Sequence, residues 1–263
     1  FDRMDPAGDV QPGLKSLDAV LTALAARGDQ LDDPEAPISG WSFDPIYFGD
    51  DRMTRADLDK VSTTRPIGIL HASAHIMNVN TKALEMSGLM RTGINHSGLS
   101  LGADGYPTGE LQGPDAMMMA NDCVNFDRAV LACDEQGIQE FSRLCVRTGV
   151  TTAADLANPL TDETVDTMLR VTGADSFPTR IVSLRRFLAM TAAEMIDRVR
   201  VLKTKSSERL RLGMVKVVTD GSVQGFTSRM RWPGHFNGKP TGLWYISPQH
   251  LQALYEAALA AAV

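Results

Sequence analysis

Helical and strand patterns alternate regularly in the second half of the chain. A helical pattern ends at Gly149, a second helix begins near Thr161, and a capping box at Thr191–Glu194 opens a third. Between and after these helices we predict strands at Val150–Ala154, Arg180–Leu184 and Leu212–Thr219. Strands that alternate with helices at this spacing run parallel. We therefore expect three neighbouring parallel strands, in chain order.

This alternation indicates an α/β protein and leaves two architectures open. A doubly wound sheet and a (β/α)8 barrel both satisfy the pattern. No GxGxxG segment and no P-loop follows any predicted strand, so a dinucleotide or ATP site has no support.

The first half carries weaker structural signals. A helical pattern runs from Leu14 to Leu24, and we expect Gly28 to follow the end of that helix. Residues 28–66 are rich in Asp, Pro and Gly and are expected to form loops. Beyond them we predict a strand at Ile67–Leu70, a helix at Thr81–Met86 and a hairpin turn at Asp104-Gly105.

Charge and cysteine content limit the partners and the compartment. A formal net charge of -6 argues against nucleic acid or an anionic membrane as the main partner. No apolar stretch approaches the roughly 20 residues that span a bilayer. The three cysteines form no CxxC pair, which fits reduced thiols in a cytoplasmic protein. We expect a small-molecule substrate, with a homodimer left open.

Lys216 stands inside the apolar run Met214–Thr219. A lysine there is costly unless its charge is paired or removed. By strand alternation Lys216, Val218 and Asp220 would share one face, with Asp220 at the carboxyl end of the strand, where barrel active sites form. The alternative is a lysine that extends from a sheet edge to solvent.

Two further residues are candidates from the sequence alone. His71 and His75 have the i, i+4 spacing of a helical metal site, but the preceding strand pattern argues against a helix there. A hydrogen-bonded histidine without a ligand role is therefore the default for His75. Trp41, in a polar loop, either lines a pocket or packs structurally, and both stay open.

Six segments stand in order along the chain: Gly40–Pro45, Leu58–Ile67, His75–Leu84, Asp104–Gly109, Gly149–Thr152 and Lys216–Ser222. They resemble, in this order, the motifs Gly-Trp-Gly-Tyr-Asp-Pro, Leu-Asp…Arg-Pro-Val, His-x4-Asn-Ser-x-Ala-Leu, Asp-Gly-x-Pro-Thr-Gly, Gly-Ile-Thr-Ser and Lys-x3-Asp-Gly-Ser. These belong to amidohydrolase family 3, the metal-dependent hydrolases that include N-substituted formamide deformylase.

The resemblance implies part of a TIM (β/α)8 barrel with a large α+β insertion. Residues 1–29 would be a helical segment after barrel strand one, residues 30–125 the insertion, and residues 126–263 barrel strands two to four with their helices. We predict a last helix that opens at Ser247-Pro248, with Ser247 as its N-cap. Phe1 is not a methionine, and the Ala-rich pattern of this helix has no stop signal up to Val263, so we expect an internal fragment, inactive by itself.

The resemblance also implies the chemistry. The full protein would hydrolyse a non-peptide C–N bond, in an amide, a formamide or a cyclic ureide, with one or two divalent metal ions, zinc being the expected metal. Lys216 aligns with a lysine that is often carboxylated and bridges two metals. His75, Trp41 and Asp220 are expected to contact substrate or form pocket walls, and the catalytic base is expected beyond Val263.

Three departures separate this chain from the family pattern. No His-x-His occurs in it, Ser73 replaces a common Asp, and Gly225–Arg229 differs from the usual Gly-Ser-Arg-Thr-Ala. Two other functions stay open: a barrel lyase in which Lys216 forms a Schiff base, and a non-catalytic barrel that binds a ligand.

Overall fold

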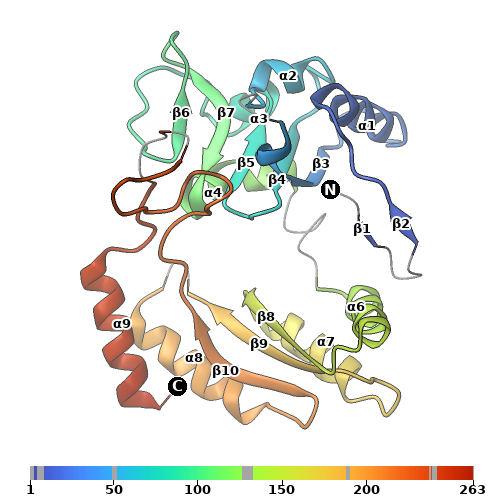
Figure 1. Ribbon diagram of the computed structural model, residues 1–263, viewed down its shortest axis with the longest axis vertical. Coiled ribbons are helices and arrows are strands. Elements are labelled where there is room, and N and C mark those ends of the chain that lie inside the picture. Colours follow the sequence, from blue (N-terminus) through green and yellow to red (C-terminus); the bar gives the residue numbers. More distant parts are fainter. Residues whose placement is uncertain are drawn as a thin grey trace. The chain divides into compact units, whose positions relative to one another are not determined.

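The computed structural model describes residues 3–4, 9–48, 52–125, 133–187, 190–236, 238 and 242–262. The chain forms two compact units. The first comprises Gly13–Ala132 and Asp220–Tyr245, and the second comprises Asp2–Pro12, Cys133–Thr219 and Ile246–Val263. Each unit has its own sheets and helices (Figure 1).

The first unit is built on a mixed five-stranded sheet with the order β3-β4-β5-β7-β6. Its strands are β3 (Ile38–Phe43), β4 (Ile67–His71), β5 (Ile76–Val79), β6 (Leu99–Leu101) and β7 (Pro107–Gln112). Its helices are α1 (Leu17–Asp29), the 3-10 helix η1 (Pro45–Phe48), α2 (Arg55–Asp59), α3 (Thr81–Met86) and α4 (Gly113–Val124). Only β3 and β4 pair in parallel; the other pairs are antiparallel.

Both faces of β4 are buried, which explains its continuous apolar run. Ile67 and Ile69 face a core with residues of α1 and α2. Leu70 faces a second core with residues of α3 and α4. The sheet is therefore covered on both sides of β4, which is an interior strand between β3 and β5.

Residues 28–66 are not simply loops, and that prediction is wrong. The segment contains β3, whose glycine and serines weaken the strand signal in the sequence. At Gly40, an added Cβ would lie 3.3 Å from side-chain atoms of both Ile69 and Leu24. The missing side chain lets α1 and β4 pack closely against this strand, so tertiary contacts override the local signal.

Gly28 also differs from its prediction. It lies inside α1, which continues to Asp29. An added Cβ there would approach Cδ1 of Ile38 to 2.9 Å. A larger residue would make the end of the Ile38 side chain shift, so Gly28 favours close packing against β3, and it does not end the helix.

Ser42 adopts a left-handed backbone conformation, with φ of 74°. It stands at the register shift between Trp41 and Phe43, where β3 and β4 leave regular pairing. The family motif that this segment resembles has glycine here, the residue that adopts this conformation without strain. Ser42 therefore carries strain that the family pattern avoids.

We expect Ser42→Gly to raise the free energy of unfolding of the first unit by ~1 kcal/mol, because relief of strain exceeds the entropy lost from a more flexible unfolded chain. Urea titration followed by tryptophan fluorescence measures this, since Trp41, Trp232 and Trp244 all belong to the first unit. Ser42→Ala is the control. It keeps a Cβ and should bring no gain; an equal gain in both variants would refute the backbone explanation.

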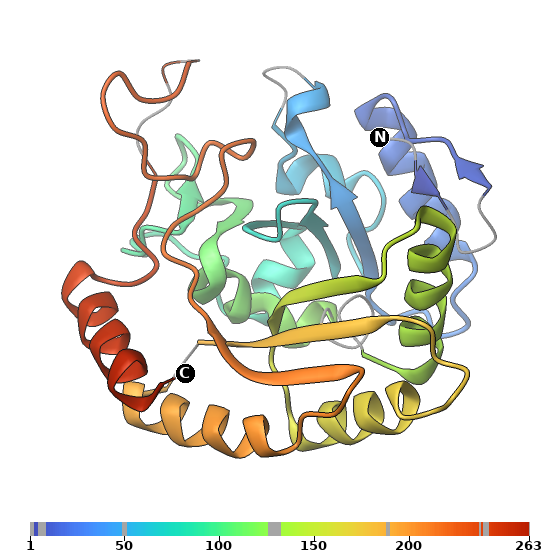
Figure 2. The ribbon, with the colours of Figure 1, turned by 60° about the horizontal axis from the view of Figure 1, so that its bottom comes forward.

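The second unit contains the parallel strands that the sequence predicts. β8 (Thr152–Asn158), β9 (Arg180–Arg186) and β10 (Leu210–Lys216) pair in parallel, with β9 in the middle. The helices are α6 (Glu135–Thr148), α7 (Asp162–Thr172), α8 (Ala192–Thr204) and α9 (Pro248–Ala261). Figure 2 shows α7 and α8 along one side of this sheet. A short antiparallel pair, β1 (Arg3–Met4) and β2 (Val10–Gln11), completes the strands.

The helix ends of this unit confirm the predicted signals. Gly149 ends α6 with φ of 73°. Thr161 caps α7, Thr191 and Glu194 form the capping box of α8, and Ser247 caps α9. Each cap hydroxyl accepts a hydrogen bond from a backbone N–H that the helix itself leaves unpaired.

The α/β class is confirmed. In the described residues the sheets are open and do not close into a barrel.

Candidate functional site

Alternate side chains of β7 form the floor of a pocket in the first unit. Thr108, Glu110 and Gln112 share one face of the strand, because successive residues of a strand point to opposite sides. Leu111, between them, points into the core with α3 and α4. The strand therefore presents three polar groups on one side while its other side anchors it.

Arg52 and Glu110 form a two-point ion pair at this floor. Nε and Nη2 of Arg52 donate to the two carboxylate oxygens at 2.8 and 2.5 Å. The Glu110 side chain is 7% exposed and that of Arg52 is 26% exposed. Burial by itself raises the pKa of Glu110, but hydrogen bonds from Arg52 and Gln112, with the charge of Arg52, hold it below the usual value. Glu110 is therefore ionised at neutral pH.

Gln112 extends this network along the floor. Its Nε2 donates to Oε1 of Glu110 at 2.7 Å and to Oγ of Ser100 at 3.4 Å. The carboxylate can only accept here, so the orientation of the Gln112 amide is fixed. Thr108 donates from its hydroxyl to the Ser100 carbonyl on the neighbouring strand β6.

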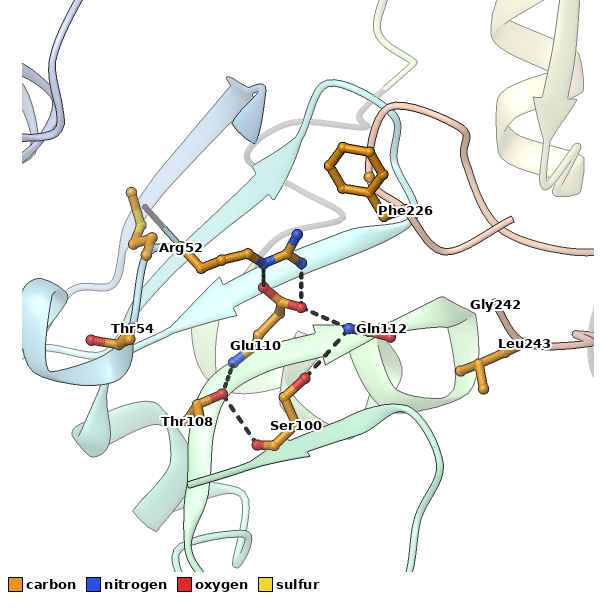
Figure 3. A pocket seen from close by; sticks show the side chains of 11 residues that line it. Arg52, Thr54, Ser100, Thr108, Glu110, Gln112, Phe226, Gly242 and Leu243 are labelled. Atoms are coloured by element: carbon orange, nitrogen blue, oxygen red, sulfur yellow. Dashed lines mark hydrogen bonds and ion pairs between the residues drawn. The ribbon is translucent and has the colours of Figure 1, made fainter. Parts of the chain in front are cut away.

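The pocket above this floor has a volume of about 580 Å³. Its other walls come from Met53 and Thr54, which precede α2, and from the segment Asp220–Tyr245. Figure 3 shows Phe226 and Leu243 on the walls around the polar floor. A polar floor between apolar walls is the usual composition of a small-molecule site.

Close backbone packing holds the wall-forming segment in place. Cβ atoms added at Gly221 and Gly242 would lie within 2.4 Å of the Thr227 carbonyl oxygen, so only glycine fits at either position. Phe226, beside Thr227, has φ of 56°, a strained conformation for a residue with a side chain. Strain of this kind concentrates at binding sites.

Asp220 lies at the base of this segment. Its carboxylate accepts the backbone N–H of Arg229 at 2.8 Å, and its backbone forms a bridge with Trp244. The Arg229 guanidinium lies 5.2 Å from the centre of the Trp244 ring. Asp220 thus closes the loop that carries Phe226, although it does not itself line the pocket.

A buried histidine lies close to the same network. Nε2 of His71 is 2.5 Å from Oδ1 of Asn78, whose Nδ2 donates to the Met53 carbonyl at 2.7 Å. The Asn78 oxygen therefore faces His71, and Nε2 must be the donor. Nδ1 is buried with no partner among the described residues. Burial lowers the pKa of His71 to about 4, so its ring is neutral at physiological pH.

The structure places His75 and Trp41 elsewhere in the first unit. His75 lies in the turn between β4 and β5, outside any helix, and its ring stacks on Tyr245 at 5.7 Å. Trp41 is in β3 and is 52% exposed, so the prediction of a loop there is wrong. Neither lines the pocket above β7.

Lys216 is the last residue of β10 and belongs to the second unit. Its carbonyl accepts the N–H of Phe187, just after the end of β9. Residues 217–219 continue without a strand, so the predicted sharing of one strand face by Lys216, Val218 and Asp220 is wrong. The reason is the partner strand, because β9 ends at Arg186, and after the hydrogen bond from Phe187 no described residue of that segment pairs with the chain beyond Lys216. Lys216 is only partly buried.

The surroundings of Lys216 bear on metal binding. Its register partner is Arg186, whose side chain points to the same face of the sheet. The carboxylate of Asp155, on β8 at the other edge of this sheet, already accepts hydrogen bonds from Asn158 and Ser183 at 2.6 and 2.9 Å. In the described part of the chain, no three His, Cys, Asp or Glu side chains gather to hold a metal ion. These residues by themselves do not fit a divalent metal.

Comparison with known proteins identifies the class. A family model described as the amidohydrolase family matches residues 9–258, and the chain belongs to that family. This confirms the resemblance at the level of the family. No curated protein matches the chain.

Two solved structures share the fold. Both are uncharacterized metal-dependent hydrolases, from Pyrococcus horikoshii OT3 and Pyrococcus furiosus, with TM-scores of 0.52 and 0.50 and 16% identity each. They cover 95% and 96% of this chain. The matched region is 47% and 49% of their own length, so the chain spans about half of the hydrolases that it matches.

The sequence did not single out Arg52, Glu110 or Gln112. The one available signal was the polar alternation at 108, 110 and 112, directly after the predicted turn. Arg52 lies 58 residues from its partner, and no local pattern links the two.

Among the described residues, no helix has the length and apolar character needed to cross a membrane.

Proposed function

We propose that the full-length protein is a metal-dependent hydrolase of non-peptide C–N bonds, acting on amides, formamides or cyclic ureides. The observation that carries this proposal is the family match over residues 9–258. The two structural relatives are titled metal-dependent hydrolases, and we extend that dependence to this protein, with zinc as the metal. A bound divalent metal would lower the pKa of a water molecule and polarise the scissile carbonyl.

We further propose the place of this chain in the larger fold. Strands β8, β9 and β10 would be barrel strands two to four, residues 1–29 would follow strand one, and residues 30–125 would form the insertion. The parallel order of the three strands supports this. His75, Trp41 and Asp220 remain our proposed substrate contacts or pocket walls.

Lys216 is the proposed metal ligand, as a carboxylated lysine. Its position at the carboxyl end of β10 supports this, because barrel active sites form at that end of the strands. As a free amine beside Arg186 it would repel a cation, so carboxylation is required for the role. The described residues contain no complete ligand set for a metal ion, so the remaining ligands would come from other parts of the full-length protein.

In the full-length protein, Lys216→Ala should lower turnover of a formamide and ureide panel by on the order of 10²-fold and reduce bound metal, with little change in fold. Lys216→Glu should keep part of the metal, because it supplies a carboxylate in the same region. Elemental analysis and turnover are the measurements. Lys203→Ala, at an exposed lysine of α8, is the matched control.

Two outcomes would overturn this assignment. Full metal content and near-normal turnover in Lys216→Ala would make Lys216 a structural lysine. Trapping of a carbonyl substrate on Lys216 by borohydride in metal-free protein would instead establish the Schiff-base lyase.

A further inference from the structure

Two hydrogen-bonding atoms at the floor of the pocket above β7 have no partner among the residues that the structure describes. Arg52 donates to Glu110 through Nε and Nη2, and no described residue accepts from its Nη1. Gln112 donates through Nε2, and no described residue donates to its Oε1. In Figure 3, Nη1 of Arg52 points toward Phe226, and the Gln112 oxygen points toward Leu243. These two atoms therefore offer a ligand one donor group and one acceptor.

The charges at the floor favour a neutral ligand. The Arg52 cation is compensated by the Glu110 carboxylate, which is held ionised by two partners. A bound carboxylate would meet the Glu110 charge, and a bound ammonium group would meet that of Arg52. At this partly buried floor such repulsion is stronger than in bulk water. A neutral polar group avoids both penalties.

The walls and the volume favour an apolar body on that group. Met53, Phe226 and Leu243 supply apolar surface around the floor. About 580 Å³ exceeds what a lone formamide or acetamide would fill and accommodates a ring with a short substituent. Phe226 lines this wall from a loop position with a left-handed backbone, φ of 56°.

We propose that this pocket is a binding site for a neutral carboxamide or ureide with an apolar substituent. The ligand carbonyl accepts from Nη1 of Arg52, and its N–H donates to Oε1 of Gln112. Arg52, Gln112 and Phe226 then determine specificity. As a substrate pocket this assignment rests on the proposed hydrolase function; as a binding site it is independent of it.

The test measures binding to metal-depleted, full-length protein, without turnover, by ligand-observed NMR and calorimetry. The probes are benzamide, benzoate and acetophenone, which share a ring and differ in the polar group. We expect benzamide to bind with a dissociation constant of about 1 mM. Acetophenone, which cannot donate to Gln112, should bind ~5-fold to 10-fold more weakly. Benzoate should bind more weakly than either.

Variants assign the preference to individual residues. Gln112→Met, similar in shape, should remove the advantage of benzamide over acetophenone, because it cannot accept from the amide N–H. Phe226→Ala should weaken both probes by about 10-fold, because it removes apolar contact. Gln252→Met, an exposed glutamine of α9, is the matched control and should change nothing.

Three results would overturn the proposal: tighter binding of benzoate than of benzamide, a benzamide preference that survives Gln112→Met, or no saturable binding of any probe. Far-ultraviolet circular dichroism and the tryptophan signal of each variant establish that the first unit is folded. Loss of hydrolysis in the Lys216 variants would not affect these measurements. Failure of the pocket and failure of the hydrolase assignment are therefore distinguishable.

Discussion

Glu110→Ala is expected to destabilise the first unit by about 3 kcal/mol. The substitution leaves the Arg52 guanidinium largely buried without its partner and removes an acceptor for Gln112. Removal of one member of a buried ion pair is costly, because the other charge stays desolvated and uncompensated. Urea titration followed by tryptophan fluorescence reports this unit selectively, since it contains all three tryptophans.

Two variants separate the charge from the packing. Glu110→Gln keeps the shape and one acceptor oxygen, and should lose less stability than Glu110→Ala. The double variant Arg52→Met with Glu110→Leu removes both charges, and should recover much of the loss, since apolar replacements of a buried pair are often close to neutral. A double variant as unstable as Glu110→Ala would show that the loss comes from packing around β7, not from an unpaired charge.

The second unit could be predicted well because its signals are local. Each helix boundary depends on a side chain within a few residues of it, as with Thr191 and Glu194, or on a glycine in a left-handed conformation, as with Gly149. Helices placed between strands then dictate parallel pairing. The end of β10 was the exception, because it depends on where the neighbouring strand stops and not on the residues of β10 itself.

The first unit was harder to predict because distant segments decide it. β3 pairs with β4 in parallel, yet its own residues include a glycine and two serines. Packing of α1 and β4 on Gly40 stabilises it as a strand. The pocket has the same origin, since Arg52, β7 and the Asp220–Tyr245 segment meet only in three dimensions.

Among the candidate residues, the structure separates positions that the motif resemblance had grouped. Asp220 and Lys216 are four residues apart, but they belong to different units. Strand alternation does not extend from one to the other, and Asp220 is engaged with the backbone of Arg229. Spacing along a chain predicts a shared face only where the strand continues through both positions.

Acidification should destabilise the first unit between about pH 6.5 and 4, through His71. Burial lowers the pKa of His71 from 6.5 to about 4, against smaller raising effects from Asn78, Glu110 and Asp44; Arg52 lowers it further. Between these values the unfolded chain binds a proton at His71 and the folded chain does not. Stability therefore rises with pH through this window and is lost as pH falls. The difference between these two pKa values corresponds to a loss of ~3 kcal/mol at most in the free energy of unfolding.

The measurement is the free energy of unfolding from urea titrations at pH 7, 6, 5 and 4.5, followed by tryptophan fluorescence. His71→Gln does not titrate, yet can still donate to the Asn78 oxygen, so it should lose most of the slope in this window. His96→Gln makes the same substitution in the loop before β6 and should keep the slope. Glu110 contributes only at the acid end of this window, because its pKa is lowered in the folded protein and the unfolded chain protonates it only near the usual value of 4.5. If the free energy of unfolding of His71→Gln depended on pH as steeply as that of the unmodified protein, His71 would be protonated in the folded protein or another group would dominate. The explanation by a buried neutral His71 would then be wrong.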